Sequence, residues 1–175
     1  MTGRAAQLAE AITLVVLDVD GVLTDGAVTY GGGEREETKS FNIKDGLGIK
    51  LLQQSGIDVA IITGRVSDAV KRRAAELGIS MLVEGREDKG DALRELLAQR
   101  SLSAAHVAYM GDDLPDLSAL RLAGLATCPS DAAARVLREV DWVASCAGGT
   151  GAVRELSEFI LQAQGQLERL YEAFE

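Results

Sequence analysis

The chain has 175 residues, a length that suits one domain with a single substantial core. Its hydrophobic fraction of 47% is that of an ordinary globular protein, and its aromatic fraction of 4% leaves the core to Val, Ile, Leu and Ala. The formal net charge of −9 argues against nucleic acid or an anionic membrane surface as a partner.

Other simple features narrow the class of protein further. No apolar run approaches the roughly 20 residues of a membrane-spanning helix, and the N-terminal segment lacks a cleavable signal pattern. Cys128 and Cys146 are too few for a disulfide framework, so we expect two buried thiols and a reducing, cytoplasmic setting. His106 is the only histidine and precedes an apolar run, which favours a structural role and excludes a site built on paired histidines.

Strand-like and helix-like segments alternate along the chain, which is typical of a parallel sheet covered by helices on both faces. The first strand is expected at 13–19. Residues 26–41 hold two short β-prone pieces around Gly31-Gly32-Gly33 and are predicted to form a projecting hairpin. The remaining predicted strands are 59–63, 80–83, 106–110, 125–128 and 142–143.

The predicted helices follow these strands. Their ranges are 45–54, 66–77, 89–100, 116–123 and 131–140, with a long terminal helix from 150 to about 174 inside a C-terminal segment of 150–175. Gly165 is a weak point in that last helix. We therefore expect a doubly wound, Rossmann-like α/β fold in one domain over residues 1–175, without a cap domain.

The first predicted strand ends in two aspartates, Asp18 and Asp20, followed by a glycine. Because side chains alternate along an extended strand, the two carboxylates share a direction. They lie at the carboxyl edge of a parallel sheet, where open α/β sheets bind ligands. Two ionised carboxylates this close repel each other, which costs free energy unless a cation lies between them. The pattern predicts a magnesium-assisted phosphoryl-transfer site.

Further polar groups follow later strands. Thr63-Gly64-Arg65 ends one strand, Gly111-Asp112-Asp113 ends another with Asp116 close behind, and Lys89 begins a helix. Each is also typical of an ordinary feature: a strand-to-helix turn, a capped and solvated turn, and a surface lysine. Their ordered recurrence at strand ends of one sheet favours a shared site.

Phosphoryl transfer assigns a role to each of these groups. Asp18 is the expected nucleophile, forming an aspartyl-phosphate, and Asp20 the general acid and then base. Asp18, the backbone carbonyl of Asp20, and Asp112 are the expected ligands of Mg²⁺, which prefers oxygen. Thr63 and a nearby backbone N–H can donate to the phosphoryl group, and Lys89 can neutralise charge on it and on Asp18.

These residues, in this order, resemble the four motifs of the haloacid dehalogenase superfamily, and Asp20 resembles the acid of its phosphatase branch. Residues 18–26, 41–49, 61–65 and 148–155 are further similar to the 3-deoxy-D-manno-octulosonate (KDO) 8-phosphate phosphatase family. The Phe-Asn-x-x-Asp-Gly and Gly-Gly-x-Gly-Ala-Val-Arg segments are specific to that family, and the resemblance extends from about Ile12 to Gln166. It implies a cytoplasmic, magnesium-dependent tetramer that acts on a phosphorylated sugar acid in lipopolysaccharide synthesis.

The intervals after the first motif and between the second and third have no room for a cap domain. An uncapped site needs either a large substrate or a neighbouring subunit to close it. The exposed hairpin favours the neighbour, and the family resemblance implies the same. We therefore expect a homotetramer assembled around the hairpins.

Recognition of a sugar-acid carboxylate needs cations. Arg65, Arg86 and Arg154 are candidates beside Thr63, Gly64 and Lys89, because guanidinium binds carboxylate through a bidentate fork. Arg65 and Arg86 are equally typical of exposed loop arginines, and Arg154 is more typical of a solvated helix arginine than of a substrate ligand. The glycines of 148–151 either approach a ligand or form a flexible joint. Residues 86–88, Arg-Glu-Asp, are more charged than the family pattern, which leaves the sugar contacts near Lys89 open.

Two alternatives stand beside this interpretation. A phosphatase for a related nine-carbon, sialic-acid-type sugar phosphate would carry the same motifs and differ only in its pocket. A catalytically inactive oligomerisation or regulatory module would be expected to have lost one of the chemical groups. This chain retains all of them: Asp18, Asp20, Thr63, Lys89 and Asp112.

Overall fold

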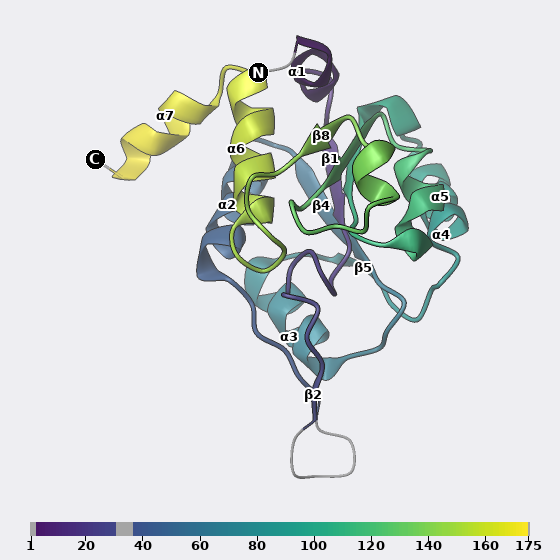
Figure 1. Cartoon of the computed structure of the whole chain (residues 1–175). Helices are drawn as coiled ribbons and strands as arrows, with labels where there is room; N and C mark the ends of the chain where they lie inside the picture. The colour runs from purple at the N-terminus through teal and green to yellow at the C-terminus, as the bar shows by residue number, and fades with distance from the viewer. Residues whose placement is uncertain (1–2, 31–36, 175) are drawn as a thin grey trace.

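The computed structural model describes residues 3–30 and 37–174. Its centre is a six-stranded parallel sheet in the order β5-β4-β1-β6-β7-β8 (Figure 1). The order reverses on either side of β1, as in doubly wound folds, which confirms the expected fold class. The strands are β1 (Leu14–Leu17), β4 (Asp58–Ile62), β5 (Met81–Val83), β6 (Val107–Met110), β7 (Leu125–Cys128) and β8 (Trp142–Val143).

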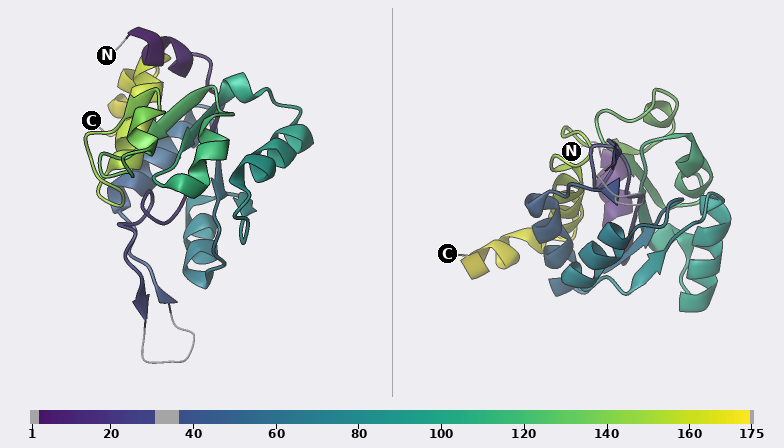
Figure 2. Two further views of the ribbon diagram at one scale, coloured as in Figure 1. Left: turned by 45° about the vertical axis from the view of Figure 1, so that its right-hand side comes forward. Right: turned by 90° about the horizontal axis from the view of Figure 1, so that it is seen from below.

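Helices cover both faces of the sheet (Figure 2). One face packs against α1 (Gly3–Ala9), α2 (Ile43–Gln54), α3 (Asp68–Leu77) and α6 (Ala152–Ala163), and the other against α4 (Lys89–Arg100) and α5 (Leu117–Leu120). Strand β1 shows why two faces form. Val15 and Leu17 belong to the first core, and Leu14 and Val16 to the second, because alternate side chains point to opposite faces.

A two-stranded antiparallel ribbon projects from this body (Figure 1). It consists of β2 (Thr29–Tyr30) and β3 (Glu37–Thr38), where Thr29 pairs with Thr38 and Tyr30 with Glu37. The stem of the hairpin predicted over 26–41 is thus confirmed. The predicted tip around Gly31-Gly32-Gly33 lies outside the described residues.

Some predicted helices were wrong. Residues 131–140 form turns and a short 3-10 helix at Val136–Arg138, and the N–H of Ala133 donates to the carbonyl of Asp112 (2.8 Å). The segment 116–123 contains only the short α5, preceded by a 3-10 turn at Leu114–Asp116.

The terminal helix expected from 150 to about 174 is broken. It consists of α6, α7 (Leu167–Tyr171) and a 3-10 turn at Glu172–Phe174, with Gly165 between α6 and α7 at φ +66°. The amide of Gln164 donates to the carbonyls of Ala9 and Ile12 (3.1 and 2.8 Å) and anchors the end of α6 beside α1. Helix α1 was not predicted, because it buries only Ala5 and Ala9 and so shows little apolar periodicity.

Within the described part of the chain, none of the helices has the length and apolarity needed to cross a membrane.

Candidate active site

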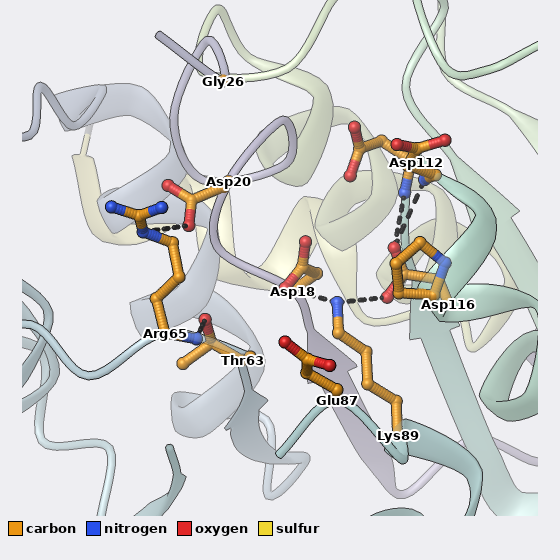
Figure 3. Close-up of a pocket in the computed structure, with 12 residues that line it drawn as sticks. Asp18, Asp20, Gly26, Thr63, Arg65, Glu87, Lys89, Asp112 and Asp116 are labelled. Atoms are coloured by element: carbon orange, nitrogen blue, oxygen red, sulfur yellow. Dashed lines mark hydrogen bonds and ion pairs between the residues drawn. The ribbon is translucent and has the colours of Figure 1, made fainter. Parts of the chain in front are cut away.

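The register of the sheet brings the predicted groups to one edge. Leu17 pairs with Ile61 on one side and with Met110 on the other, so Asp18, Thr63 and Asp112 follow at nearly the same level. A cavity of about 620 Å³ opens over this edge (Figure 3). The predicted residues that line it are Asp18, Asp20, Thr63, Gly64, Arg65, Lys89 and Asp112.

Lys89, the first residue of α4, is 5% exposed and lies between two carboxylates. Its Nζ is 2.8 Å from Asp18 Oδ1 and 2.7 Å from Asp116 Oδ1. Burial by itself would lower the pKa of Lys89, but the charges and hydrogen bonds of both aspartates raise it. The ammonium therefore stays charged beside the expected nucleophile.

Asp116 is the centre of this arrangement, and the sequence pattern assigned it no role. Its Oδ1 accepts from Lys89 and from the Tyr109 hydroxyl (2.9 Å), and its Oδ2 accepts from the backbone N–H groups of Asp112 (3.2 Å) and Asp113 (3.3 Å). Asp113 and Asp116 form a capping box, so the Asp-x-x-Asp spacing was the available signal. Tyr109 is fully buried in β6 and looked like an ordinary core residue.

Carboxylate oxygens of Asp18, Asp112 and Asp116 all lie within 4.8 Å of one another. Burial, followed by the charge of Asp116, raises the pKa of Asp18 to about 6 in spite of Lys89. Burial and the charges of Asp18 and Asp116 raise the pKa of Asp112 to about 7. Because one ammonium faces three carboxylates, a divalent cation would relieve the remaining repulsion, and an all-oxygen donor set suits magnesium. The residues present therefore fit a magnesium ion.

The turn after β1 closes tightly over this cluster. The N–H groups of Val22, Leu23 and Thr24 all donate to the carbonyl of Val19. Gly21 has φ +87°, and a Cβ there would lie 2.1 Å from Asp112 Oδ2. Only glycine therefore lets this turn, which carries Asp20, pass so close to Asp112.

The glycine segment 148–151 contacts the backbone of this turn. A Cβ on Gly148 would lie 1.9 Å from the carbonyl oxygen of Gly21, and the N–H of Gly149 donates to the carbonyl of Val22 (2.9 Å). The Asn42 amide in turn donates to the carbonyl of Gly149 (3.2 Å). Gly148 and Gly149 thus pack against the backbone of the turn after β1, and contact of the glycine segment with a ligand stays a prediction.

Asp20 lies on the opposite side of Asp18 from Asp112 and Asp116 (Figure 3). Its Oδ1 forms an ion pair with Lys39, and its Oδ2 is 3.9 Å from Arg65 Nε. Thr63 Oγ1 accepts from the N–H of Arg65 at 3.3 Å. Lys39 was missed, since a lysine in a polar hairpin carries no signal in the sequence.

Comparisons with known proteins identify the family of the chain. The haloacid dehalogenase-like hydrolase family matches residues 81–156. The 3-deoxy-D-manno-octulosonate 8-phosphate phosphatase KdsC of Escherichia coli strain K12 is 45% identical over 160 residues, which cover 91% of this chain and 85% of the relative. The chain belongs to the KDO 8-phosphate phosphatase family. KdsC of Haemophilus influenzae is also 45% identical, over 91% of this chain and 88% of the relative.

Solved structures of KDO 8-phosphate phosphatases share the whole fold. The enzyme from Moraxella catarrhalis, in complex with a magnesium ion, a phosphate ion and KDO, has a TM-score of 0.97 at 43% identity and covers 100% of both chains. The cobalt-bound enzyme from Haemophilus influenzae has a TM-score of 0.89 at 42% identity, covering 95% of this chain and 99% of that one. The resemblance drawn from the motifs is thereby confirmed.

Two of the arginines considered for sugar-acid recognition in this KDO 8-phosphate phosphatase family member do not line the cavity. Arg86 binds Asp88 (2.7 Å) and Glu95 (2.8 Å), and Arg154 binds Glu158 (2.5 Å). Nearby carboxylates thus engage both guanidinium groups: Glu158 is one helical turn from Arg154, whereas Glu95 reaches Arg86 from nine residues away. Their role as substrate ligands stays a prediction.

Proposed function

We propose that this protein is a magnesium-dependent phosphatase that hydrolyses KDO 8-phosphate to KDO and inorganic phosphate, a step in lipopolysaccharide sugar synthesis. The observation that carries the proposal is the placement of Asp18 at the cavity, 2.8 Å from the buried ammonium of Lys89 and clustered with Asp112. Membership of the KDO 8-phosphate phosphatase family supports the choice of substrate.

In the first step, a carboxylate oxygen of Asp18 attacks the phosphorus and forms an aspartyl-phosphate. The bond from phosphorus to the sugar oxygen breaks, and Asp20 gives its proton to that leaving oxygen. Lys89, the Thr63 hydroxyl and a backbone N–H beside it stabilise the charge on the transferring group. These residues all line the cavity, so their side chains reach a common volume.

In the second step, water attacks the phosphorus and Asp20 accepts its proton. The bond between phosphorus and the Asp18 oxygen breaks, which releases phosphate and restores the carboxylate. Asp18, Asp112 and the backbone carbonyl of Asp20 would hold a magnesium ion, and the ion when bound supplies neutralisation of carboxylate and phosphoryl charge. Asp116 is a weaker candidate ligand, because its oxygens already accept four hydrogen bonds.

The test is phosphate release from a panel of phosphate esters. KDO 8-phosphate, a nine-carbon sialic-acid-type 9-phosphate and p-nitrophenyl phosphate are each assayed with magnesium and with a chelator. We expect the highest kcat/KM for KDO 8-phosphate and no turnover in chelator. Preference for the nine-carbon ester would reject the proposed substrate, and full turnover by Asp18→Asn would reject the proposed nucleophile.

We also propose that the protein is a cytoplasmic homotetramer in which a neighbouring subunit closes the active site. The described residues between Asp18 and Lys89 hold the hairpin stem, α2, β4, α3 and β5, with no cap domain over the cavity. Apolar side chains are exposed on and after the hairpin: Val28 (39%), Tyr30 (80%) and Ile43 (82%). Such a surface suits contact between subunits. Multi-angle light scattering should give four chains, and a fully active monomer would contradict the assembly.

A further inference from the structure

Lys39 connects the projecting hairpin to the active site. It follows β3 directly, and its side chain is only 1% exposed although it carries a charge. A buried ammonium is costly unless a carboxylate faces it. Its Nζ forms an ion pair and a hydrogen bond with Asp20 Oδ1. The stem of the hairpin is therefore fastened to the residue expected to move protons.

The two cations at Asp20 differ in their surroundings. Arg65 Nε is 3.9 Å from Asp20 Oδ2, and the Arg65 side chain is 46% exposed, so water screens this contact. The Lys39 contact is shorter and sheltered from water. Figure 3 shows Asp20 beside Arg65 at the cavity, next to Asp18. Lys39 does not line that cavity. The stronger constraint on the Asp20 carboxylate thus comes from a residue placed outside the substrate space.

We propose that Lys39 is a positioning residue for general acid–base catalysis. By binding one oxygen of Asp20, it prevents rotation of the carboxylate and keeps the other oxygen turned toward the leaving group and the attacking water. A general acid has to lie within hydrogen-bond reach of its proton acceptor, and its neighbours have to hold it there. The inference rests on the proposed phosphatase function and assigns to the hairpin stem a part in the chemical step.

The proposal predicts a dependence on the leaving group. A sugar alkoxide leaves only if it receives a proton, whereas p-nitrophenolate is a stable anion and leaves without one. Loss of the Lys39 contact should therefore slow formation of the aspartyl-phosphate, which kcat/KM reports, much more for a sugar phosphate than for p-nitrophenyl phosphate; the water step that follows is common to both esters. A residue that only stabilised the fold, or only bound the phosphate, would affect both substrates alike.

The experiment compares Lys39→Met with Lys44→Met, an exposed lysine in the first turn of α2 that loses the same charge. We expect Lys39→Met to lower kcat/KM for the sugar phosphate by about 10²-fold and kcat/KM for p-nitrophenyl phosphate by less than about 5-fold. Lys44→Met should match the wild type on both. If Lys39 acts through Asp20, adding Lys39→Met to Asp20→Asn should change kcat/KM by no more than about 2-fold.

The proposal would be overturned if Lys39→Met slowed both substrates by the same factor. It would also be overturned if Lys39→Met slowed the Asp20→Asn variant by as large a factor as it slows the wild type. If Lys39→Met does not fold, Lys39→Leu, which also removes the donor, should show the same difference between the two substrates; no difference would again overturn the proposal. A different result would reject the proposed function. A wild-type protein that hydrolyses other sugar phosphates but not KDO 8-phosphate would reject that substrate, while the role of Lys39 is measured on the ester it does hydrolyse.

Discussion

Two opposed effects act on the carboxyl group of Asp18. Burial raises its pKa to about 6, yet in the proposed mechanism this carboxyl group has to be ionised to attack phosphorus. Lys89 meets part of this need by direct contact, and Asp116 holds Lys89 in place from the other side. Asp18, Lys89 and Asp116 therefore depend on one another, and a change at any of them should affect both stability and the proposed activity.

Replacing Lys89 with Met should destabilise the fold and abolish turnover. The variant leaves Asp18 and Asp116 facing each other in a buried site, and removal of one partner from a buried ion pair costs about 3–5 kcal/mol. Urea denaturation would measure the loss. Arg94→Met, which removes an exposed ion pair with Asp91, is the control and should cost less than about 1 kcal/mol. Equal costs at the two positions would contradict the description of Lys89 as the buried centre of the cluster.

At the scale of elements, the catalytic turn depends on segments far away in the sequence. Asp45 of α2 accepts the N–H of Arg154 in the first turn of α6 (2.8 Å), and Asn42, next to α2, binds Gly149. The family motifs around residues 41–49 and 148–155 thus fasten α2 to α6 and press the 148–149 backbone against the turn. These two motifs therefore stabilise the position of the turn that carries Asp20.

Gly148→Ala should displace the catalytic turn. A methyl group would lie 1.9 Å from the Gly21 carbonyl oxygen, so the backbone has to shift beside Asp20 and Asp112. We expect kcat/KM to fall by about 10²-fold, because small displacements of catalytic groups are costly. The control is Gly3→Ala in α1, where no atom lies within 4 Å of the added carbon. Normal activity of Gly148→Ala would show that the turn does not need this support.

Asp45→Ala should loosen the junction between α2 and α6. It removes the buried acceptor of the Arg154 N–H in the first turn of α6, which costs about 1–3 kcal/mol. Thermal unfolding monitored by circular dichroism would measure the change. An unchanged melting temperature would mean that water or another side chain replaces the carboxylate.

At the scale of the whole molecule, the acidic cluster links stability to pH and to metal. The pKa values of Asp18 (about 6) and Asp112 (about 7) lie above their ordinary value in the folded protein. The metal-free folded state therefore binds more protons than the unfolded chain between about pH 4 and pH 7. Its stability consequently falls as pH rises through that window.

Magnesium should reverse this trend. Since the ion binds the ionised carboxylates, it stabilises the folded state more at pH 8 than at pH 5. The melting temperature, measured with magnesium and with chelator, should show a gap that widens with pH. Asp112→Asn should narrow the gap, because it removes one proposed ligand and one repelling charge. A gap independent of pH would contradict the assignment of these carboxylates to the metal.

The sequence by itself determined the family, the parallel α/β fold, and the residues at the strand ends, Asp18, Thr63 and Asp112. Those features follow from apolar periodicity and chain connectivity, which act over short stretches. Only the tertiary structure decided the contact of Lys39 with Asp20, the hydrogen bonds of Asp116 and the packing of Gly148 on Gly21. These contacts join residues from separate elements, and they depend on how side chains pack in space, a property that no local pattern records.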